Sequence, residues 1–368
     1  MEWTAPHGIG VPEWWSSDYQ TWEPSMDQIT TVGIDLAKSV FQVHGVGATG
    51  AVLLQRRLRR AHVIAFFAKL PPCLVGLEAC ATGHYWARQL RDLGHDVRLI
   101  PPRHVKAYVR RNKNDRADAE AICEAVTRPR TRNVPIKSEA QQAALMMHRA
   151  RDLLVRQRTM LVNALRGHLA EFGIVTPQGL GHVATLAAVV ADKNDMRLPG
   201  SARATLAVVV AQISAVDAAV ADLEAKILTW HQGTDTSQRL ATIPGVGPLI
   251  ASAIVATVPD PSVFRSSREF AAWLGLVPRQ NSTGGKERLG SISKQGDRYL
   301  RRLLINGAFS ALRSKHGRAD PWFVALRDRK PPLVAAVAVA NKLARIAWAV
   351  MSRGEAFHRP HRAEAAAA

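Results

Sequence analysis

The stretch VGIDLAKSVFQVHGV, residues Val32 to Val46, decides the fold of the first part of this chain. Its opening residues are β-branched, a type that packs well on the buried face of a sheet, and Gly33 leaves room for another backbone or a ligand to approach closely. Asp35 stands where this first strand ends. Alternating apolar residues resume after a short turn and predict a second strand up to Val46. The stretch therefore delivers one carboxylate at the end of a buried strand.

The flanking residues predict a sheet of five strands whose second half alternates with helices. The predicted strands are 31–35, 40–46, 51–58, 73–78 and 97–100, and the predicted helices are 62–70, 83–93 and 115–126, with a basic helix or loop at 105–111. The order βββαβαβα, with acids at strand ends, is the ribonuclease H arrangement, and such sheets gather catalytic groups at the carboxyl ends of their strands. We therefore expect an α/β domain over residues 30–135, after a poorly ordered extension at 1–29.

Composition and charge indicate a folded protein with an anionic partner. The chain has 368 residues, 47% of them hydrophobic, and a net charge of +19, which is the electrostatic footprint of a nucleic-acid-binding protein. The three cysteines form no CxxC pair and fit a reduced, cytosolic protein. Polar residues at Asn341, Lys342 and Arg345 interrupt the apolar run at 331–351, so we expect no membrane span.

Two long helices are predicted at 139–172 and 201–232, within a helical region that we place at 136–235. Apolar residues on the second helix recur in steps of four and three, the spacing of a coiled-coil seam: Val209, Ile213, Val216, Val220, Leu223, Ile227 and Trp230. The first helix carries the same spacing: Met146, Ala150, Leu153, Gln157, Met160 and Ala164. A dimerising or domain-spacing coiled coil and an ordinary helical hairpin both fit, because heptads alone do not fix the partner.

The sequence LATIPGVGPLIASAIVATVPD, from Leu240 to Asp260, predicts a helix-hairpin-helix. Gly245 and Gly247 expose backbone N–H groups at the start of the second helix, where the helix dipole favours an anion. The alternative is a plain turn between two helices, but the paired glycines favour a phosphate cradle.

Positive charge is concentrated in residues 265–330, which hold 15 Lys and Arg against 5 Asp and Glu. This segment contains the polar loop NSTGGK, with Ser282 between basic residues, and Asp297 is expected to cap a helix that starts at Arg298. A further alanine-rich helix is predicted at 331–352. The basic residues expected to contact nucleic acid here are Arg279, Lys286, Arg288, Lys294, Arg298, Arg301 and Arg302.

Four acids form the candidate catalytic set: Asp35, Glu78, Asp115 and Asp118. The first two end predicted strands, and the other two are three residues apart on one helix, so they face the same way. Phosphoryl chemistry needs hard oxygen ligands for Mg²⁺, and two such ions can stabilise the attacking and leaving oxygens. Basic residues flank the set and would hold a nucleic-acid backbone beside it: Arg110, Arg111, Lys113 and Arg116. The alternative is that the helix acids only complement the helix dipole.

Four segments together resemble the DEDD-type insertion-sequence transposases, the bridge-RNA-guided recombinase family related to Piv-type DNA invertases. They are GIDLAKSVFQVHG, GLEACATGHYWARQL, LIPPRHVKAYVRRNKNDRADAEAI and GLVPRQNSTGGKERLGSISKQGDRYLRRLLI, in the order and spacing of the family. The resemblance covers about residues 30–353. It implies a RuvC-like N-terminal domain, a coiled coil and a mainly helical C-terminal transposase domain at 236–353, followed by a tail at 354–368.

The resemblance also implies a mechanism. The four acids would carry the Mg²⁺ site, and the family's serine nucleophile maps onto Ser282, with Thr283 the neighbouring candidate. The serine would form a covalent link to a DNA phosphate, and a hydroxyl needs activation for this step. Further expected partners are a guide RNA that selects sequence by base pairing and a second copy of the chain, as a dimer or tetramer. Such a protein would act in the bacterial cytoplasm, at the nucleoid.

Two other functions fit the same residues. One is a metal-dependent nuclease of the Holliday-junction type that uses only the four acids, with Ser282 as a bystander. The other is a non-catalytic nucleic-acid-binding protein in which the acids serve as helix caps. A protein–DNA adduct that depends on Ser282 would separate the recombinase from the nuclease, and a Mg²⁺-dependent activity would exclude the third function.

Overall fold

The computed structural model describes residues 28–109, 115–129, 131–286 and 288–358. The chain forms two compact units, Met1–Ile136 and Lys137–Ala368. Several sequence-based assignments lie outside the described residues, namely the extension up to residue 27, the basic residues Arg110, Arg111 and Lys113, and the tail beyond residue 358.

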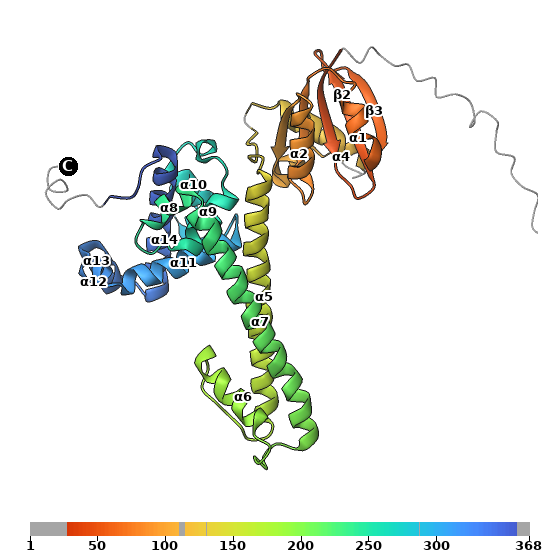
Figure 1. The fold of residues 1–368 in the computed structure, drawn as a ribbon. Coiled ribbons are helices and arrows are strands. Elements are labelled where there is room, and N and C mark those ends of the chain that lie inside the picture. Colours follow the sequence, from red (N-terminus) through yellow and green to blue (C-terminus); the bar gives the residue numbers. More distant parts are fainter. Residues whose placement is uncertain (1–27, 110–114, 130, 287, 359–368) are drawn as a thin grey trace, which may run out of the picture. The chain divides into compact units, whose positions relative to one another are not determined.

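The N-terminal unit is built on a five-stranded sheet (Figure 1). Its strands are β1 (Ile29–Asp35), β2 (Val40–Gly47), β3 (Val52–Arg59), β4 (Leu74–Glu78) and β5 (Asp96–Ile100), in the order β3-β2-β1-β4-β5. The first three strands pair antiparallel, whereas β1 with β4 and β4 with β5 pair parallel. All five strands occur where the sequence predicts them, and their order is that of the ribonuclease H fold.

Helices pack on both faces of this sheet. One face carries α1 (Val63–Phe67) and α2 (Gly83–Asp92), which form a core with alternate strand residues such as Val32 and Leu77. The other face carries α4 (Asp115–Thr127), while the short helices α3 (Pro102–Val105) and η4 (Lys106–Tyr108) follow β5. Successive strand residues point to opposite faces, so each strand contributes to both layers.

Helix α4 lies directly on the backbone of β1 and β4, because each strand has a glycine beneath it. A Cβ on Gly33 would lie 2.7 Å from the Cβ of Cys123 and would overlap the carbonyl oxygen of Ala119. A Cβ on Gly76 would lie 2.8 Å from the Cβ of Val126. These two glycines are paired in the register of β1 with β4, so they form one flat platform under the helix.

The C-terminal unit is helical apart from one small hairpin. Its long helices are α5 (Glu139–Ala170), α7 (Gly200–Gln232) and α14 (Pro332–Arg353). Its shorter helices are α6 (Val183–Ala191), α8 (Asp235–Ala241), α9 (Pro248–Thr257), α10 (Ser267–Trp273), α11 (Arg298–Arg313), α12 (Lys315–Ala319) and α13 (Pro321–Arg329). Asp297 accepts a hydrogen bond from the backbone of Leu300 at 2.8 Å, which confirms the predicted cap of α11.

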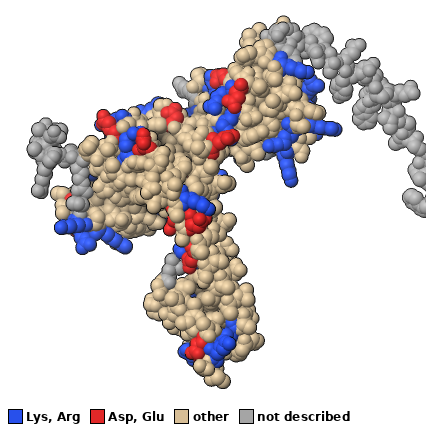
Figure 2. Space-filling model, viewed as in Figure 1, with Lys and Arg blue, Asp and Glu red and all other residues tan. Residues whose placement is uncertain are grey.

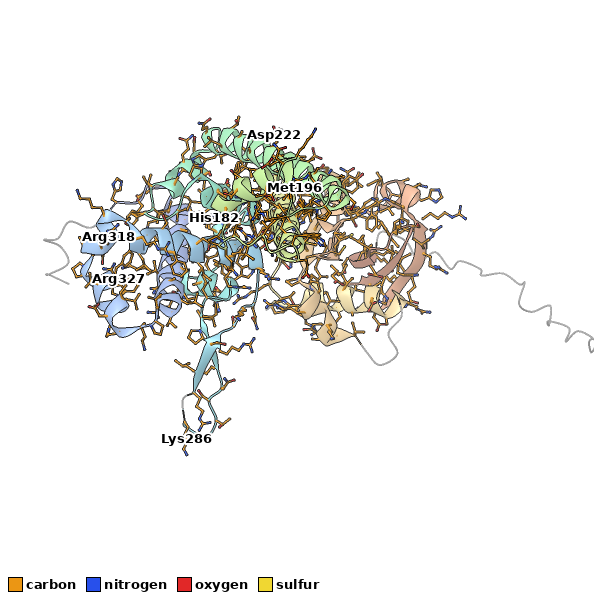
Figure 3. The ribbon with its side chains drawn as sticks, turned by 90° about the horizontal axis from the view of Figure 1, so that it is seen from below. His182, Met196, Asp222, Lys286, Arg318 and Arg327 are labelled. Atoms are coloured by element: carbon orange, nitrogen blue, oxygen red, sulfur yellow. The ribbon has the colours of Figure 1, made fainter. Side chains whose placement is uncertain are left out.

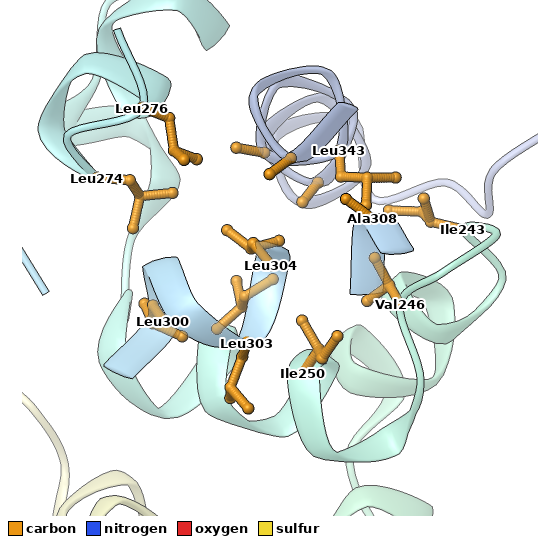
Figure 4. Close-up of a cluster of buried hydrophobic side chains, with 14 of the residues drawn as sticks. Ile243, Val246, Ile250, Leu274, Leu276, Leu300, Leu303, Leu304, Ala308 and Leu343 are labelled. Atoms are coloured by element: carbon orange, nitrogen blue, oxygen red, sulfur yellow. The ribbon is translucent and has the colours of Figure 1, made fainter. Parts of the chain in front are cut away.

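The core of this unit forms where α11 and α14 meet the segment from Leu240 to Leu276 (Figure 4). Side chains from α9, α11 and α14 interdigitate there, among them Ile250, Leu304 and Leu343. Eight residues of α14 are buried, which explains its apolar composition. Both α7 and α14 are long and apolar enough to cross a membrane, but a core helix passes the same test, and α14 is one.

Helices α5 and α7 form an antiparallel hairpin. Two ion pairs join them, Arg151 with Glu224 and Arg158 with Asp217, so residue numbers rise on one helix as they fall on the other. Four seam residues of α7 are buried: Ile213, Val216, Val220 and Ile227. The matching stripe on α5 is exposed within the described chain, since Met146, Leu153 and Met160 retain 67%, 57% and 72% of their accessible surface. The α5–α7 hairpin therefore buries the apolar stripe of α7 and leaves that of α5 exposed.

We predict that Gly33→Val loosens the α4 layer. The added side chain forces overpacking, which costs about 1–3 kcal/mol, so amides of β1 and α4 should exchange with deuterium about 5- to 150-fold faster. The measurement is native-state hydrogen exchange of the full chain.

The control is Gly167→Ala, at an exposed position of helix α5 where an added Cβ meets nothing within 4 Å. It should leave exchange in β1 and α4 unchanged. Wild-type exchange rates in Gly33→Val would contradict the close contact.

A buried histidine ties α5 to the core of the C-terminal unit. His148 lies 3.1 Å from both the hydroxyl of Tyr299 and that of Ser252. Ser252 donates its own hydroxyl hydrogen to the carbonyl of Pro248 at 2.6 Å, so it accepts from Nε2–H of His148, and Nδ1 accepts from Tyr299. Burial lowers the pKa of His148 from 6.5 to about 4, which fits a neutral ring with both nitrogens satisfied.

We predict that this histidine makes the C-terminal unit acid-sensitive. Its pKa is lower in the folded than in the unfolded chain, so its contribution is complete above pH 6.5 and is lost as pH falls towards 4. The loss amounts to about 3 kcal/mol. Urea unfolding from pH 7 to pH 4 should show a smaller pH slope in His148→Gln than in the wild type. His168→Gln, on an exposed site of the same helix, is the control, and equal slopes in all three proteins would refute the assignment.

Candidate active site at the carboxyl ends of two parallel strands

Two of the candidate acids end neighbouring parallel strands. Asp35 is the last residue of β1 and Glu78 the last of β4, and the residues just before them, Ile34 and Leu77, are register partners. Adjacent strands lie about 4.8 Å apart, and side chains alternate between the two faces. Asp35 and Glu78 are therefore side by side on the face that carries Gly33 and Gly76, which is the α4 face.

Helix α4 brings a third acid to the same end of the sheet. Asp118 is half-buried and lies one turn before Ile122. Ile122 packs in a cluster with Ile100, the last residue of β5, and Ile100 is the register partner of Glu78. Asp118 thus lies on the side of α4 that faces the carboxyl ends of the strands. Asp115 is the first residue of α4, and its side chain is outside the described part of the structure.

Carboxylates are the residue type that holds Mg²⁺ in proteins. Within the described residues, no group of three His, Cys, Asp or Glu side chains is close enough to hold a metal by itself. Mg²⁺ in enzymes that act on phosphates is commonly held by one or two protein carboxylates, with phosphate oxygens and water completing the octahedron. The pair Asp35 and Glu78 supplies that number of carboxylates.

A polar network on the same face anchors the start of α4. Arg116 donates a hydrogen bond to the side-chain carbonyl of Gln55 on β3. The amide nitrogen of Gln55 lies 3.4 Å from Nδ1 of His44 on β2. Burial lowers the pKa of His44, while Glu120 opposes this effect and Arg116 adds to it. The sequence analysis missed this network, although strict alternation from Val40 onward places His44 on the α4 face.

Ser282 lies in a β-hairpin where the sequence analysis expected a flexible loop. The strands are β6 (Pro278–Gln280) and β7 (Leu289–Ile292), and the turn at Gly284 and Gly285 has positive φ at both residues, 55° and 78°. Two consecutive residues with positive φ are the type I′ turn that suits a hairpin. The hairpin projects from the helical body, with Lys286 at its tip (Figure 3). Ser282 is half-buried, and its Oγ accepts a hydrogen bond from the backbone N–H of Arg288 at 3.3 Å.

The predicted basic residues of this segment fall into two groups. Five are exposed: Arg279, Lys286, Arg288, Lys294 and Arg298. The other two are tied to the protein. Arg301 is only 9% exposed and donates to the carbonyls of Leu274 at 3.0 Å and Gln295 at 2.7 Å. Arg302 pairs with Asp152 and lies over the ring of Tyr299. The structure thus gives Arg301 a structural role at the base of the hairpin instead of a place on the binding surface.

The predicted helix-hairpin-helix corresponds to α8, a turn and α9. Gly245 has φ of +89°, and a Cβ there would lie 2.6 Å from the carbonyl oxygen of Gly307 on α11, so this glycine serves close backbone packing. Around Gly247 the space is open. Pro248 begins α9 and has no N–H, which leaves one donor fewer for an anion than the sequence pattern suggests.

Comparisons with known proteins identify the family of this chain. A family model described as "Transposase IS116/IS110/IS902 family" matches residues 237–322, and a second transposase model, of the DEDD type found in IS110, matches residues 32–174. A probable family 20 transposase of Pseudomonas aeruginosa is 49% identical over 336 residues, covering 90% of this chain and 99% of the relative. The transposase for insertion sequence element IS1328 of Yersinia enterocolitica is 41% identical, with 90% of this chain and 99% of the relative covered.

A ribonuclease H-like sheet with acids at its carboxyl ends, followed by a helical unit, is the organisation of a DNA transposase. The chain belongs to the IS116/IS110/IS902 family of insertion-sequence transposases, and the family resemblance seen in the sequence motifs is confirmed. The transposase for insertion sequence element IS1111A of Coxiella burnetii is a further relative, 38% identical over 90% of this chain and 92% of the relative.

Proposed function

We propose that this transposase cuts and exchanges DNA strands through Ser282, assisted by a Mg²⁺ site at the acids of the N-terminal unit. The observation that carries the proposal is the placement of Asp35 and Glu78 at adjacent strand ends on the α4 face. Clustered acids are costly unless a cation or a proton compensates their charge.

The acids would orient the reacting phosphate through a bound cation. Asp35, Glu78, Asp115 and Asp118 would hold Mg²⁺, which supplies positive charge to the attacking and leaving oxygens. The protein fixes where these acids lie. Asp35 and Glu78 end rigid strands, and Asp118 is on a helix packed against a glycine platform. Sites built on strands and helices hold their geometry better than sites on loops.

Ser282 supplies the nucleophile. A bond forms between Oγ and the phosphorus, the bond from phosphorus to the deoxyribose oxygen breaks, the serine proton leaves to solvent and the released oxygen takes up a proton. The hydrogen bond from the N–H of Arg288 stabilises negative charge as it develops on Oγ. The DNA strand is then joined when a second hydroxyl attacks the phosphoserine, with the reverse exchange of bonds. Thr283 is the alternative nucleophile in the same hairpin.

The remaining parts of the proposal concern partners. The exposed basic residues of the C-terminal unit hold the DNA backbone, and the turn from Ile243 to Gly247 adds a backbone contact as a helix-hairpin-helix. A structured guide RNA selects the sequence by base pairing. The acids and Ser282 belong to different compact units, so a dimer or tetramer can pair the serine of one subunit with the acids of another. The place of action is the bacterial cytoplasm, at the nucleoid.

A metal-dependent junction nuclease is the second candidate. It is favoured by one observation, which is that Asp35, Glu78 and Asp118 all lie in the N-terminal unit, independently of the hairpin that carries Ser282. In that case the attacking group is water, and no covalent protein–DNA intermediate forms.

We predict that Ser282→Ala abolishes a covalent protein–DNA adduct. Full-length protein, Mg²⁺, labelled element-junction DNA and RNA from the flanking non-coding region are mixed and run on a denaturing gel. The adduct should fall by at least about 10³-fold, because removing a nucleophile removes the pathway.

Ser291→Ala is the matched control, since Ser291 is exposed on the other strand of the same hairpin. It should retain the adduct. Cleaved DNA without an adduct, at equal rates in the wild type and in Ser282→Ala, would establish the nuclease instead. Loss of the adduct in Thr283→Ala alone would move the nucleophile by one residue.

A further inference from the structure

Asp35 and Glu78 belong to a row of side chains that runs across the sheet, perpendicular to its strands. Asp35 is the register partner of Gln42 on β2, and Gln42 is the partner of Arg57 on β3. With Glu78 on the other side, one row on the α4 face reads Glu78, Asp35, Gln42, Arg57. The run QRRLRR at residues 55–60, which contains Arg57, has no role in the chemistry described above.

This row lies next to the part of the sheet that α4 covers. The covered row consists of Gly76, Gly33, His44 and Gln55, which are successive register partners. Each member of the acid row is two residues from a member of the covered row on its strand, after it on β1, β3 and β4 and before it on antiparallel β2. Both rows therefore point to the same face. Arg116 fixes the start of α4 over Gln55. The acid row therefore lies beside the helix, where Asp35, Gln42 and Glu78 are half-buried and Arg57 is exposed.

The arginines of β3, and Arg60 directly after it, divide between the two faces of the sheet. Arg56 and Arg60 lie against aromatic rings of the opposite layer, with Arg56 5.8 Å from the ring centre of Phe66 and Arg60 5.0 Å from that of Trp86. Alternation places Arg57 and Arg59 on the α4 face, and both are exposed. Within the described part of the chain, neither of these two has an acidic partner. Figure 2 shows Lys and Arg side chains standing out on the side of the N-terminal unit where Figure 1 places β3.

We propose that Arg57 and Arg59 form a phosphate-binding track that positions the cleaved DNA strand on the acid row. Arg57 is two strand spacings from Asp35, about 10 Å, which corresponds to roughly three nucleotides of rise along a duplex. A strand whose reacting phosphate lies at the acids thus presents another phosphate to Arg57. The proposal rests on the function proposed above for the acids, and it identifies the phosphodiester backbone as the ligand, read without base specificity.

Electrostatics favours this arrangement. The acid row repels a phosphate strand wherever bound cations do not neutralise it, so the strand needs positive charge beside the reacting position. Arg57 and Arg59 supply fixed charge on the same face, and a guanidinium binds phosphate through two parallel hydrogen bonds. The competing explanation is that charged residues only protect the edge strand β3 against pairing with another chain. If edge protection were the only role, the arginines of both faces would contribute equally. A phosphate-binding track would use Arg57 and Arg59 alone.

The test compares two double variants that lose the same charge from the segment Arg56–Arg60. Arg57→Gln/Arg59→Gln removes the track, and Arg56→Gln/Arg60→Gln removes the two arginines of the opposite face. Binding of the full-length protein to a labelled element-end DNA duplex is measured against KCl concentration, with EDTA present so that no metal-dependent cutting occurs. Each phosphate contact contributes about 0.9 to the slope of log K against log salt. We expect the track variant to lower that slope by about 2 and the control variant to leave it unchanged.

The outcomes separate the track from the chemistry. Equal slopes for the two variants, with or without weaker binding, would overturn the track. A change seen with a structured RNA of similar length but not with DNA would also overturn it, because the ligand would then be the RNA backbone. The binding assay contains no metal and no covalent step. A failure of the Ser282→Ala adduct experiment would therefore not affect the track proposal. A circular dichroism melt of both variants verifies folding, and an unfolded track variant is replaced by the single changes Arg57→Gln and Arg56→Gln.

Discussion

The contact between helix α4 and the backbone of Gly33 and Gly76 is the constraint on which the candidate site depends. Only residues without a Cβ let a helix approach a sheet this closely, and the two glycines are register partners on the strands that end in Asp35 and Glu78. The same packing fixes the first turns of α4, so Asp118 arrives at the end of the sheet where the strand acids are. A single backbone feature thus places acids that are far apart in the sequence at one end of the sheet.

The residues that support helix α4 and the candidate catalytic residues lie in two adjacent rows of the sheet. The row beneath α4 contains two glycines, a histidine with a lowered pKa and a glutamine that accepts a hydrogen bond from Arg116, and it holds the helix in place. The adjacent row contains two carboxylates, an amide and an arginine, and it remains partly open to solvent. In the C-terminal unit the same division is seen at the hairpin, where buried Arg301 holds the base while Ser282 and Lys286 lie beyond it. Rigid supports next to open polar groups are what phosphoryl transfer requires.

Much of this could be predicted from local sequence. Alternation and apolar periodicity gave all five strands of the sheet and the long helices, because those signals depend on one element at a time. The hairpin around Ser282 was missed, since its strands are short and polar and only the Gly284–Gly285 turn marks it. The role of Gly245 and the burial of Arg301 depend on contacts with distant residues, Gly307 and Leu274, that no local pattern contains. The stripe on α5 has the right spacing but faces solvent, which shows that a heptad pattern does not name its partner.

Mn²⁺ binding tests most directly whether Asp35, Glu78 and Asp118 hold one cation, as we propose. Electron paramagnetic resonance would count Mn²⁺ bound by the full-length protein with a short element-end duplex, using the duplex alone as blank. Asp35→Asn and Asp118→Asn should each weaken binding by at least about 10-fold. Asp96→Asn, at the opposite end of the sheet and paired with Arg98, should leave it unchanged. Wild-type Mn²⁺ binding in Asp35→Asn and Asp118→Asn would contradict the account.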